Sequence, residues 1–290
     1  MMNKFLIQKA RQANLPHYLL KRGEKLKQSG QRYRHAEHES LVFTNNAYFW
    51  NARGEHGNAV DFLMSFYGMD FIEAVAELTG EEFTGQQKKE FDIGDENLCR
   101  DMSRAIAYLS KTRGIDYRLI KNLINKKYIY QESDTNNVIF RIYDEQLRPV
   151  GSEVNGTLSD KRYKGVQAGS KYGYGFNIPI GEPLKFVLFF ESAIDLISFM
   201  EIEQAKRKDL NGCLLVSMAG LKESIVRHTL DVFKGHIDAL QLVLCVDRDE
   251  AGQTFIEHIK TQIKGVREYL VDPAYKDWNE QLQANKCQKP

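Results

Sequence analysis

Residues 183–285 alternate short apolar runs with segments of helical periodicity, and this alternation restricts the possible folds more than any other feature of the chain. Runs such as KFVLFF and ALQLVLCVD, each followed by a helical pattern, are typical of strands buried on both faces of a parallel sheet. Parallel neighbours need a crossover, and the intervening helices must then cover the faces of the sheet. We therefore predict an α/β domain with a parallel sheet and flanking helices over residues 183–290.

The remaining chain predicts smaller α+β parts. Residues 98–182 begin with two helical patterns and continue with the strand-like segments NVIFRIYD and RPVGSEVNGT. Residues 1–80 contain two apolar runs around Asn45 and Asn46, which is a hairpin signal, followed by two short helical patterns. The polar stretch 81–97 is the expected linker between these two parts.

Composition narrows the class of protein. The chain has 290 residues, of which 42% are hydrophobic and 27% charged, as in an ordinary soluble protein. Its net charge of +1 gives no overall basic field, so contacts with nucleic acid must come from local patches. The sequence shows no signal peptide, no apolar segment long enough to span a membrane and no CxxC pair among its four cysteines. These features predict a cytoplasmic protein with no membrane partner.

Acidic residues follow the expected strands of the parallel sheet. Glu191 comes directly after KFVLFF, and Asp247 and Asp249 come directly after LVLCV. The carboxyl ends of parallel strands meet at one edge, where open α/β sheets bind their ligands, so we expect these side chains to converge. Neighbouring carboxylates repel one another, and a hard divalent cation such as Mg²⁺ removes that repulsion. The alternative is that the Asp-x-Asp pair caps the following helix, whose N-terminus favours anions.

Two further acids extend this pattern. Asp195 lies four residues after Glu191, and Asp277 lies in YKDWNE, which follows the last expected strand. Because the acids recur at strand ends, the sequence favours a metal site over a helix cap. The predicted metal ligands are Glu191, Asp195, Asp247, Asp249 and Asp277.

These segments resemble the motifs of the TOPRIM domain, which topoisomerases and bacterial primases share. FESAIDLISFM is similar to the primase segment EGYMD, with Glu191 and Asp195 in matching places and Ser192 where primases have glycine. VDRDEAG resembles the primase DGDxAG. YKDWNE resembles the primase KDPDE, with Asp277 retained and Asn279 in place of a second acid.

The resemblance continues upstream in the order of a primase. The segments AYLSKTRGIDYRLIKNLINKKYIY and NVIFRIYDEQLRPVGSEVNGT resemble the first half of the primase polymerase core. ARGEHGNAVDFLMSFYGMDFIEAVAELTG resembles the end of the primase N-terminal zinc ribbon. The resemblance implies a zinc-ribbon-like domain over 1–80, a primase-core-like subdomain over 98–182 and a TOPRIM domain over 183–290. Nothing resembling a helicase-docking domain follows, and such a reduced chain is similar to primase-like proteins of plasmids and other mobile elements.

The ribbon is expected to lack zinc. Trp50 and Arg53 stand where the family has thiolate ligands, and neither side chain can replace a soft anionic donor. His35, His38 and His56 remain, but without cysteine and without a fitting spacing. We expect the ribbon to be held instead by the packing of four aromatic side chains, Phe43, Tyr48, Phe49 and Trp50.

The resemblance implies nucleotidyl transfer, with Mg²⁺ or Mn²⁺ as the cofactor. Glu191, Asp247 and Asp249 would be the catalytic residues, and Glu191 would bind metal or act as a general acid–base. The implied partners are single-stranded DNA, nucleoside triphosphates, and either a replicative helicase or the replication and transfer proteins of a mobile element. Basic residues, several of them beside tyrosines in a Gly-rich stretch, are candidates for phosphate contacts: Arg113, Arg148, Lys161, Arg162, Lys164 and Lys171.

Other functions fit the same acids, because a fold does not determine a reaction. TOPRIM domains also occur in nucleases, so metal-dependent hydrolysis of nucleic acid is one alternative. The lost zinc ligands and Ser192 favour a second alternative, a non-catalytic module that binds nucleic acid or docks a partner. A type IA topoisomerase is disfavoured, since the chain is too short for the domains that supply its nucleophilic tyrosine. The synthesis of short primers on single-stranded DNA is the leading expectation.

Overall fold

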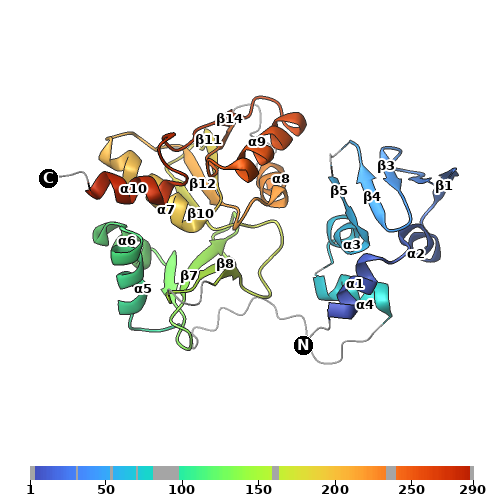
Figure 1. The fold of residues 1–290 in the computed structure, drawn as a ribbon, viewed down its shortest axis with the longest axis horizontal. Helices are drawn as coiled ribbons and strands as arrows, with labels where there is room; N and C mark the ends of the chain where they lie inside the picture. The colour runs from blue at the N-terminus through green and yellow to red at the C-terminus, as the bar shows by residue number, and fades with distance from the viewer. Residues whose placement is uncertain are drawn as a thin grey trace. The chain divides into compact units, whose positions relative to one another are not determined.

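The computed structural model describes residues 4–30, 32–52, 55–69, 71–80, 98–158, 163–232 and 240–287 (Figure 1). The chain divides into two compact units, residues 1–87 and residues 88–290. The expected linker 81–97 lies outside the described residues, and so do three residues named above, Arg53, Lys161 and Arg162.

The second unit contains the predicted parallel sheet. Its strands are β10 (Asn177–Ile180), β11 (Phe186–Phe190), β12 (Cys213–Ser217), β13 (Gln241–Leu244) and β14 (Arg267–Glu268). They lie in the order β10-β12-β11-β13-β14, and all neighbours are parallel except the edge strand β10, which is antiparallel to β12. Because β10 precedes residue 183, the sheet takes one strand from the segment expected to form the neighbouring subdomain.

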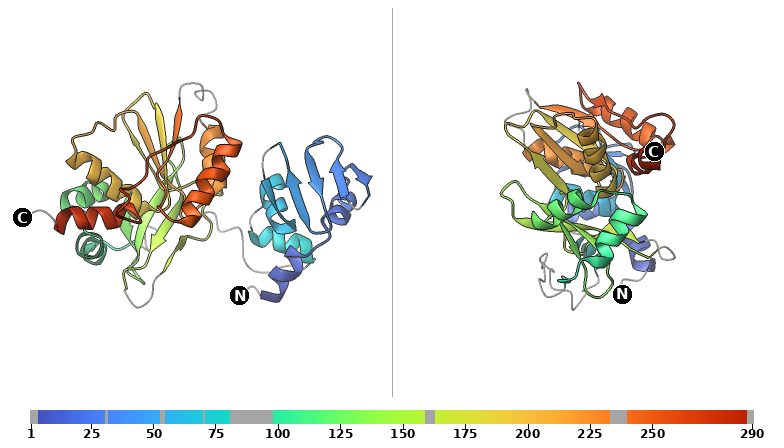
Figure 2. Two further views of the ribbon diagram at one scale, coloured as in Figure 1. Left: turned by 45° about the horizontal axis from the view of Figure 1, so that its top comes forward. Right: turned by 90° about the vertical axis from the view of Figure 1, so that its left-hand side faces the viewer.

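Helices cover both faces of this sheet, as the alternation predicts. The four helices are α7 (Ala193–Ala205), α8 (Glu223–Val232), α9 (Glu250–Gln262) and α10 (Trp278–Cys287). Alternate residues of β11 point to opposite faces. Leu188 and Phe190 pack with α7 and α10, whereas Val187 and Phe189 pack with α8 and α9. The left view of Figure 2 shows α8 and α9 (orange) on one side of the strands and α7 and α10 on the other.

A smaller antiparallel sheet precedes the parallel one. It runs in the order β6-β7-β8-β9, with β6 (Ile129–Gln131), β7 (Val138–Tyr143), β8 (Pro149–Asn155) and β9 (Lys164–Val166). The helices beside it are α5 (Ser103–Ala107), which continues as a π-helix over Tyr108–Thr112, and α6 (Tyr117–Asn125). Phe140 of this sheet belongs to the same core as Phe190 of the parallel sheet, so the two sheets share one hydrophobic interior. The predicted combination of α/β and α+β parts is confirmed.

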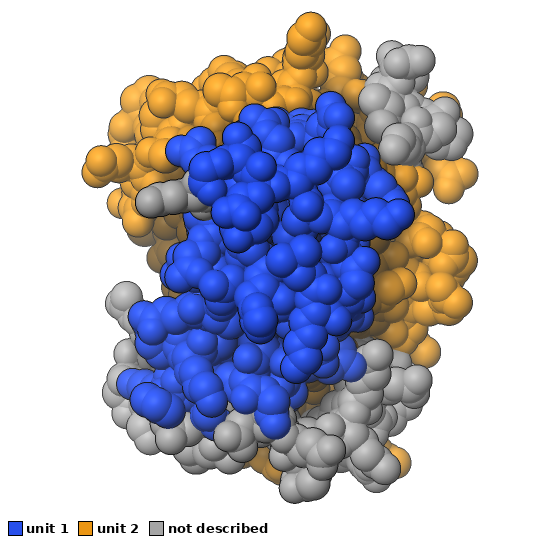
Figure 3. Space-filling view, turned by 90° about the vertical axis from the view of Figure 1, so that its right-hand side faces the viewer, with its two compact units in different colours: residues 1–87 blue, residues 88–290 orange. Residues whose placement is uncertain are grey.

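The first unit (blue in Figure 3) is an antiparallel sheet with helices. Its strands are β1 (Leu26–Ser29), β2 (Arg32–His35), β3 (Leu41–Phe43), β4 (Ala47–Trp50) and β5 (Glu55–Asn58), in that order across the sheet. Its helices are α1 (Lys4–Arg11), α2 (Leu15–Lys21), α3 (Ala59–Tyr67) and α4 (Phe71–Thr79). The predicted hairpin is β3–β4. The sequence analysis does not predict the hairpin β1–β2, because its strands are mostly polar and show no alternation of apolar and polar residues.

Aromatic rings pack together where a zinc ribbon would hold its metal. The ring of His38 lies 5.0 Å from that of His35 and 5.5 Å from that of Trp50. Phe66 closes the group, with its ring 5.6 Å from that of Trp50. His35 is buried, and its Nε2 lies 3.0 Å from a carboxylate oxygen of Glu24. Ring packing and a hydrogen bond between His35 and Glu24 therefore occupy this part of the unit.

The prediction that four aromatic side chains hold the ribbon is wrong for one of them. Phe43, Tyr48 and Trp50 are at most 5% exposed and belong to the core of the first unit. Phe49 is 44% exposed. Successive residues of a strand face opposite sides, so Phe49 lies on the open face of β4 while its neighbours face the helices.

Replacing Trp50 with alanine should lower the free energy of unfolding of the first unit by about 3–5 kcal/mol, because a buried ring is lost and a cavity is left. Urea unfolding followed by the circular dichroism signal measures this change. The matched control is Phe49→Ala on the same strand, which should cost less than about 1 kcal/mol. Adding a strong zinc chelator should leave the wild-type transition in place, and a transition that disappears with chelator would contradict this account.

Candidate active site

The turn from β11 into α7 positions Glu191 and Asp195. The carbonyl oxygen of Glu191 accepts a hydrogen bond of 2.8 Å from the Gly220 N–H, which fixes the turn. Ser192 caps α7: its Oγ accepts from the Asp195 N–H at 3.2 Å and donates to the Asp195 carboxylate. Asp195 is only 7% exposed. Serine in place of the glycine of the primase motif therefore supplies a helix cap and orients a buried acid.

The loop between β13 and α9 positions Asp247 and Asp249. Asp249 is the N-cap of α9, and its Oδ1 accepts from the Gly252 N–H at 2.9 Å. Its Oδ2 lies 3.2 Å from Lys276 Nζ. A side chain at position 252 would place its Cβ 2.1 Å from the carbonyl oxygen of Asp247, so only glycine permits this loop. The alternative interpretation, in which the acids cap the following helix, is therefore correct for Asp249. It does not explain the position of Asp247, which makes no such cap.

The start of α10 brings Asp277 to the same edge. Trp278 is fully buried, and its Nε1 donates to the Cys245 carbonyl at 2.8 Å, which docks α10 against the end of β13. Asp277 accepts from the Glu280 N–H at 2.7 Å. Asn279, which stands where primases have a second acid, is buried and donates from its backbone to Asp195 at 3.4 Å. Asn279 thus packs against α7 and supports Asp195.

The acids at this edge change one another's pKa values. Burial raises the pKa of Asp247 to about 8, with added contributions from the charges of Asp195 and Glu191. Burial and then the charge of Asp277 raise the pKa of Asp195 to about 6. Burial also raises the pKa of Glu191. In contrast, the hydrogen bond from the Gly252 N–H lowers the pKa of Asp249. Asp247 and Asp249 therefore differ in protonation at neutral pH although one residue separates them.

The donor set fits a divalent cation that is shared with a substrate. Asp247 Oδ1 is buried and has no hydrogen-bond partner in the described part of the chain. An unsatisfied buried oxygen is costly, and a cation would satisfy it. Within the same described ranges no group of three or more His, Cys, Asp or Glu side chains is arranged to hold a metal by itself. Mg²⁺ usually keeps several waters and binds through one or two carboxylates plus substrate phosphates. Asp247 and Asp249 can provide these carboxylates.

Comparison with known proteins identifies this region. Residues 188–282 match a family described as Toprim-like, and residues 107–181 match a family described as a protein of unknown function (DUF3991). An uncharacterized protein of Bacillus anthracis, pXO2-78, is 31% identical over 279 residues, and the match covers 87% of this chain and 78% of that protein. The chain belongs to the family of that protein. The predicted Toprim-like domain is confirmed over residues 188–282.

Further similar proteins are known. The 65 kDa protein of Zymomonas mobilis is 25% identical over 86% of this chain, which spans 46% of the length of that protein. The primase fragment of the bacteriophage T7 primase-helicase protein is a similar solved structure, with a TM-score of 0.47 and 17% identity over 86% of this chain and 91% of that one. The Aquifex aeolicus primase, with its zinc-binding and RNA polymerase domains, has a TM-score of 0.40 and 16% identity over 98% of this chain and 83% of that one.

One buried acid next to the Toprim-like domain was missed by sequence reasoning. Glu153 of β8 is fully buried, and its carboxylate accepts from the Ala193 N–H at 3.1 Å and from Ser217 Oγ at 2.6 Å. Ala193 begins α7 just after Glu191 and Ser217 ends β12, so this carboxylate ties the antiparallel sheet to the acidic edge. Burial raises the pKa of Glu153. The only signal for it in the sequence is a glutamate inside a strand-like segment.

The candidate basic residues are not gathered at the acids. Lys164 of β9 is the one whose charge opposes the raised pKa values of Glu191 and Asp195. Arg148 pairs with Asp144 at 2.7 Å, and Lys171 Nζ lies 4.7 Å from the centre of the Tyr174 ring. Arg113 donates to the Tyr108 hydroxyl at 2.9 Å. Lys161 and Arg162 lie outside the described residues. Lys164 is therefore the candidate that this arrangement favours most for contact with a bound phosphate.

The open face of the sheet in the first unit carries a row that sequence reasoning also missed. Paired residues of antiparallel strands lie on the same face. The row crosses all five strands in the order Lys27, Arg34, Val42, Phe49, His56. The exposed ring of Phe49 stacks on that of His56 with a centroid distance of 6.4 Å. A hollow of about 410 Å³ beside it is lined by Ser29, Arg32, Arg34, Val42, Phe49 and Asn51. Exposed rings beside cations form a surface suited to single-stranded nucleic acid.

In metal-free protein, Asp247→Asn should raise the free energy of unfolding of the second unit at alkaline pH. An unfolded Asp loses its proton near pH 4, whereas folded Asp247 keeps it up to about pH 8. The folded state binds the extra proton between these values, so this group lowers stability as pH rises through that window. Asn does not titrate, and at pH 8.5 the variant should be more stable by about 1–2 kcal/mol after allowance for solvent screening.

Urea unfolding at pH 5 and pH 8.5 in the presence of a chelator measures this difference. The control is Asp249→Ala, which removes the cap of α9 and should destabilise the protein at both pH values. Parallel pH dependences for wild type and Asp247→Asn would contradict the raised pKa.

Proposed function

We propose that this protein is a primase-like nucleotidyltransferase that synthesises short primers on single-stranded DNA from nucleoside triphosphates. The observation that carries the proposal is Asp247: a half-buried carboxylate with one buried, unpartnered oxygen among the described residues, beside four other acids in a Toprim-like domain. Such an arrangement is unfavourable without a cation and favourable with one. A divalent cation is in turn what a triphosphate needs in order to bind at an acidic edge.

In the proposed nucleotidyl transfer, a hydroxyl oxygen bonds to the α-phosphorus of a nucleoside triphosphate, the bond to the β-phosphate breaks, and pyrophosphate leaves. A Mg²⁺ or Mn²⁺ ion bound at Asp247 and Asp249 would neutralise phosphate charge and lower the pKa of the attacking hydroxyl. Asp247 would have to be deprotonated to hold such a cation, since metal ligands bind in their deprotonated form. Glu191, whose pKa is raised by burial, is suited to accept the proton of the attacking hydroxyl. Lys276, which pairs with Asp249, would then be released to contact phosphate oxygens, and Lys164 is a second cation that could contact them.

The first unit supplies the surface for the template in this proposal. Phe49 offers an exposed ring for base stacking, and Lys27, Arg32 and Arg34 on the same sheet attract the phosphates. A stacking platform with flanking cations binds single strands with little sequence preference. The unit therefore keeps a role in binding nucleic acid that does not require zinc.

We further propose that this activity serves the replication or transfer of a mobile element in the cytoplasm, together with a replicative helicase or transfer proteins. The support is family membership with a Bacillus anthracis protein of plasmid pXO2. No helix in the described ranges combines the length and the apolar character needed to cross a bilayer.

A non-catalytic module for binding or docking is the second candidate. The observation that favours it is that both oxygens of Asp249 already have partners, the Gly252 N–H and Lys276 Nζ. In that case Asp249 would serve only as a helix cap. Catalysis is distinguished from docking by whether the protein changes the length of a nucleic acid strand.

Replacing Asp247 or Asp249 with alanine should lower metal-dependent product formation at least about a hundredfold, because transition-state charge loses its stabilisation. The assay is incorporation of radiolabelled nucleotides on single-stranded DNA with Mg²⁺ or Mn²⁺. The control is Glu257→Ala, an exposed acid on α9, which should retain wild-type activity. Extended products that begin with a triphosphate support priming, and shortened strands indicate a nuclease instead. Strand binding with neither product would favour the docking module.

Replacing Phe49 with alanine should weaken binding of single-stranded DNA at least about fivefold, because one stacking contact is lost. Replacing Arg34 should reduce the slope of log affinity against log salt concentration by about 0.7, because one phosphate contact is lost. Fluorescence anisotropy with a labelled oligonucleotide at several salt concentrations measures both effects. The matched controls are the exposed Phe5→Ala and Arg11→Ala on α1. If Phe5→Ala weakens binding as much as Phe49→Ala does, the sheet face is not the binding surface.

A further inference from the structure

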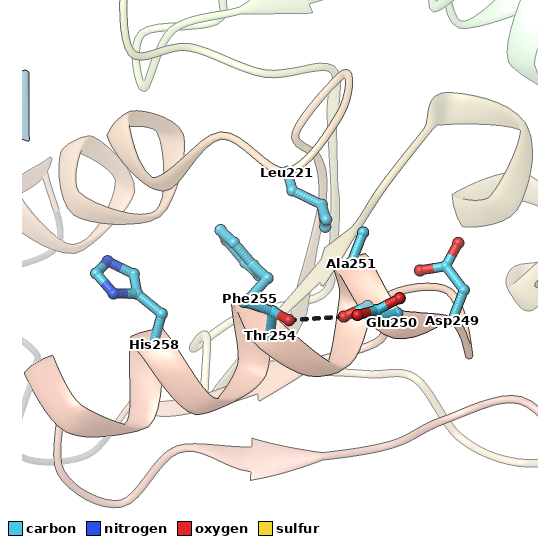
Figure 4. Close-up of a pocket in the computed structure, with 7 residues that line it drawn as sticks. All are labelled: Leu221, Asp249, Glu250, Ala251, Thr254, Phe255 and His258. Atoms are coloured by element: carbon cyan, nitrogen blue, oxygen red, sulfur yellow. Dashed lines mark hydrogen bonds between the residues drawn. The ribbon is translucent and has the colours of Figure 1, made fainter.

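A groove begins at the acidic edge and follows one side of α9. It has a volume of about 680 Å³. Its α9 wall is formed by Ala251, Thr254, Phe255 and His258, whose spacing places them on one face of the helix. Figure 4 shows Asp249 at one end of this row, His258 at the other, and Leu221 across from Ala251 and Phe255. Asp249 thus belongs both to the groove and to the acidic edge.

The groove changes character along its length. Its middle is apolar, with Leu221 facing Phe255. Its acidic end carries Asp249 and Glu250, and none of the described residues that line it is a lysine or an arginine. At the far end, His258 Nε2 lies 2.8 Å from a carboxylate oxygen of Glu223. A carboxylate only accepts, so Nε2 is the donor of this hydrogen bond, and Nδ1 is the ring nitrogen that it does not use.

We propose that this groove binds the nucleoside part of a nucleotide whose phosphates lie at the acidic edge. The inference rests on the proposed use of nucleoside triphosphates and adds the place where the base and sugar lie. The groove itself does not suit phosphate, since its charged residues are acidic and its middle is apolar. The cations that suit phosphate, Lys276 and Lys164, belong to the acidic edge and do not line the groove.

The dimensions and chemistry of the groove agree with this occupant. From Asp249 to His258 the helix advances about 13 Å, which is enough for a ribose and a base. The flat face of a base can pack against Leu221 and Phe255, and the Thr254 hydroxyl and His258 Nδ1 can bond to its polar edge or to the ribose. Because the wall is mainly apolar, shape and contact area contribute more to binding here than any particular hydrogen bond, and discrimination between bases is weak.

The test compares a ligand that has a nucleoside with one that lacks it. ATP and inorganic tripolyphosphate are titrated separately, with Mn²⁺, into the full-length protein by calorimetry. The variant Thr254→Glu places a longer charged side chain in the groove. Thr261→Glu makes the same change of charge two turns further along α9, beyond the groove, and is the matched control.

We expect Thr254→Glu to weaken ATP binding about tenfold relative to tripolyphosphate binding, because the contacts of one base are lost. Thr261→Glu should leave this ratio of affinities at its wild-type value. A second variant, Leu221→Asn, removes the apolar wall without adding charge. It should also weaken ATP binding relative to tripolyphosphate binding. A circular dichroism spectrum like that of the wild type shows that each variant is folded.

Two other outcomes are informative. If the wild-type protein binds both ligands and neither groove variant changes the ratio, the proposed nucleoside site is wrong, and an apolar side chain of a protein partner becomes the better occupant. If the wild-type protein binds neither ligand with Mn²⁺, the proposed function itself fails, and the nucleoside site fails with it. The two failures are therefore distinguishable in one set of titrations.

Discussion

The crowding of carboxylates at one edge of the parallel sheet is the constraint on which the second unit depends. Each acid arrives there because parallel strands deliver their ends to the same side, and each is partly removed from water. The structure offsets the resulting repulsion locally. Ser192 and the start of α9 give hydrogen bonds to Asp195 and Asp249, Lys276 pairs with Asp249, and a retained proton neutralises Asp247. What remains is one buried oxygen without a partner, and that residual cost is what a cation removes.

Local patterns predicted much of the fold and the acidic edge. Strands buried on both faces, such as β11 and β13, are continuous apolar runs, and the acids directly follow them. The placement of Glu191, Asp247 and Asp249 therefore follows from strand order alone. In contrast, Glu153 acts across two sheets through contacts with Ala193 and Ser217. Such contacts depend on how sheets pack, and no spacing in the sequence encodes them.

The first unit was harder to predict because its open face is polar. The row that contains Lys27, Arg34, Phe49 and His56 exists only through the register of five strands. Phe49 was assigned to the core because aromatic residues usually are buried, whereas the alternation of β4 places it outside. The absence of zinc from this unit stays a prediction. The rings of His38, Trp50 and Phe66 form a compact group at the former ligand positions.

Asp249 links the binding of a cation to the binding of an anion. It caps α9, pairs with Lys276 and borders the groove. A cation bound at its Oδ2 would compete with Lys276 for that oxygen, and the released ammonium would attract an anion. By thermodynamic reciprocity, that anion must increase the affinity for the cation by the same factor. Cation and phosphate should thus bind cooperatively, and each alone should bind weakly. The site would then respond to the complex of a metal with a nucleotide more than to the concentration of either component.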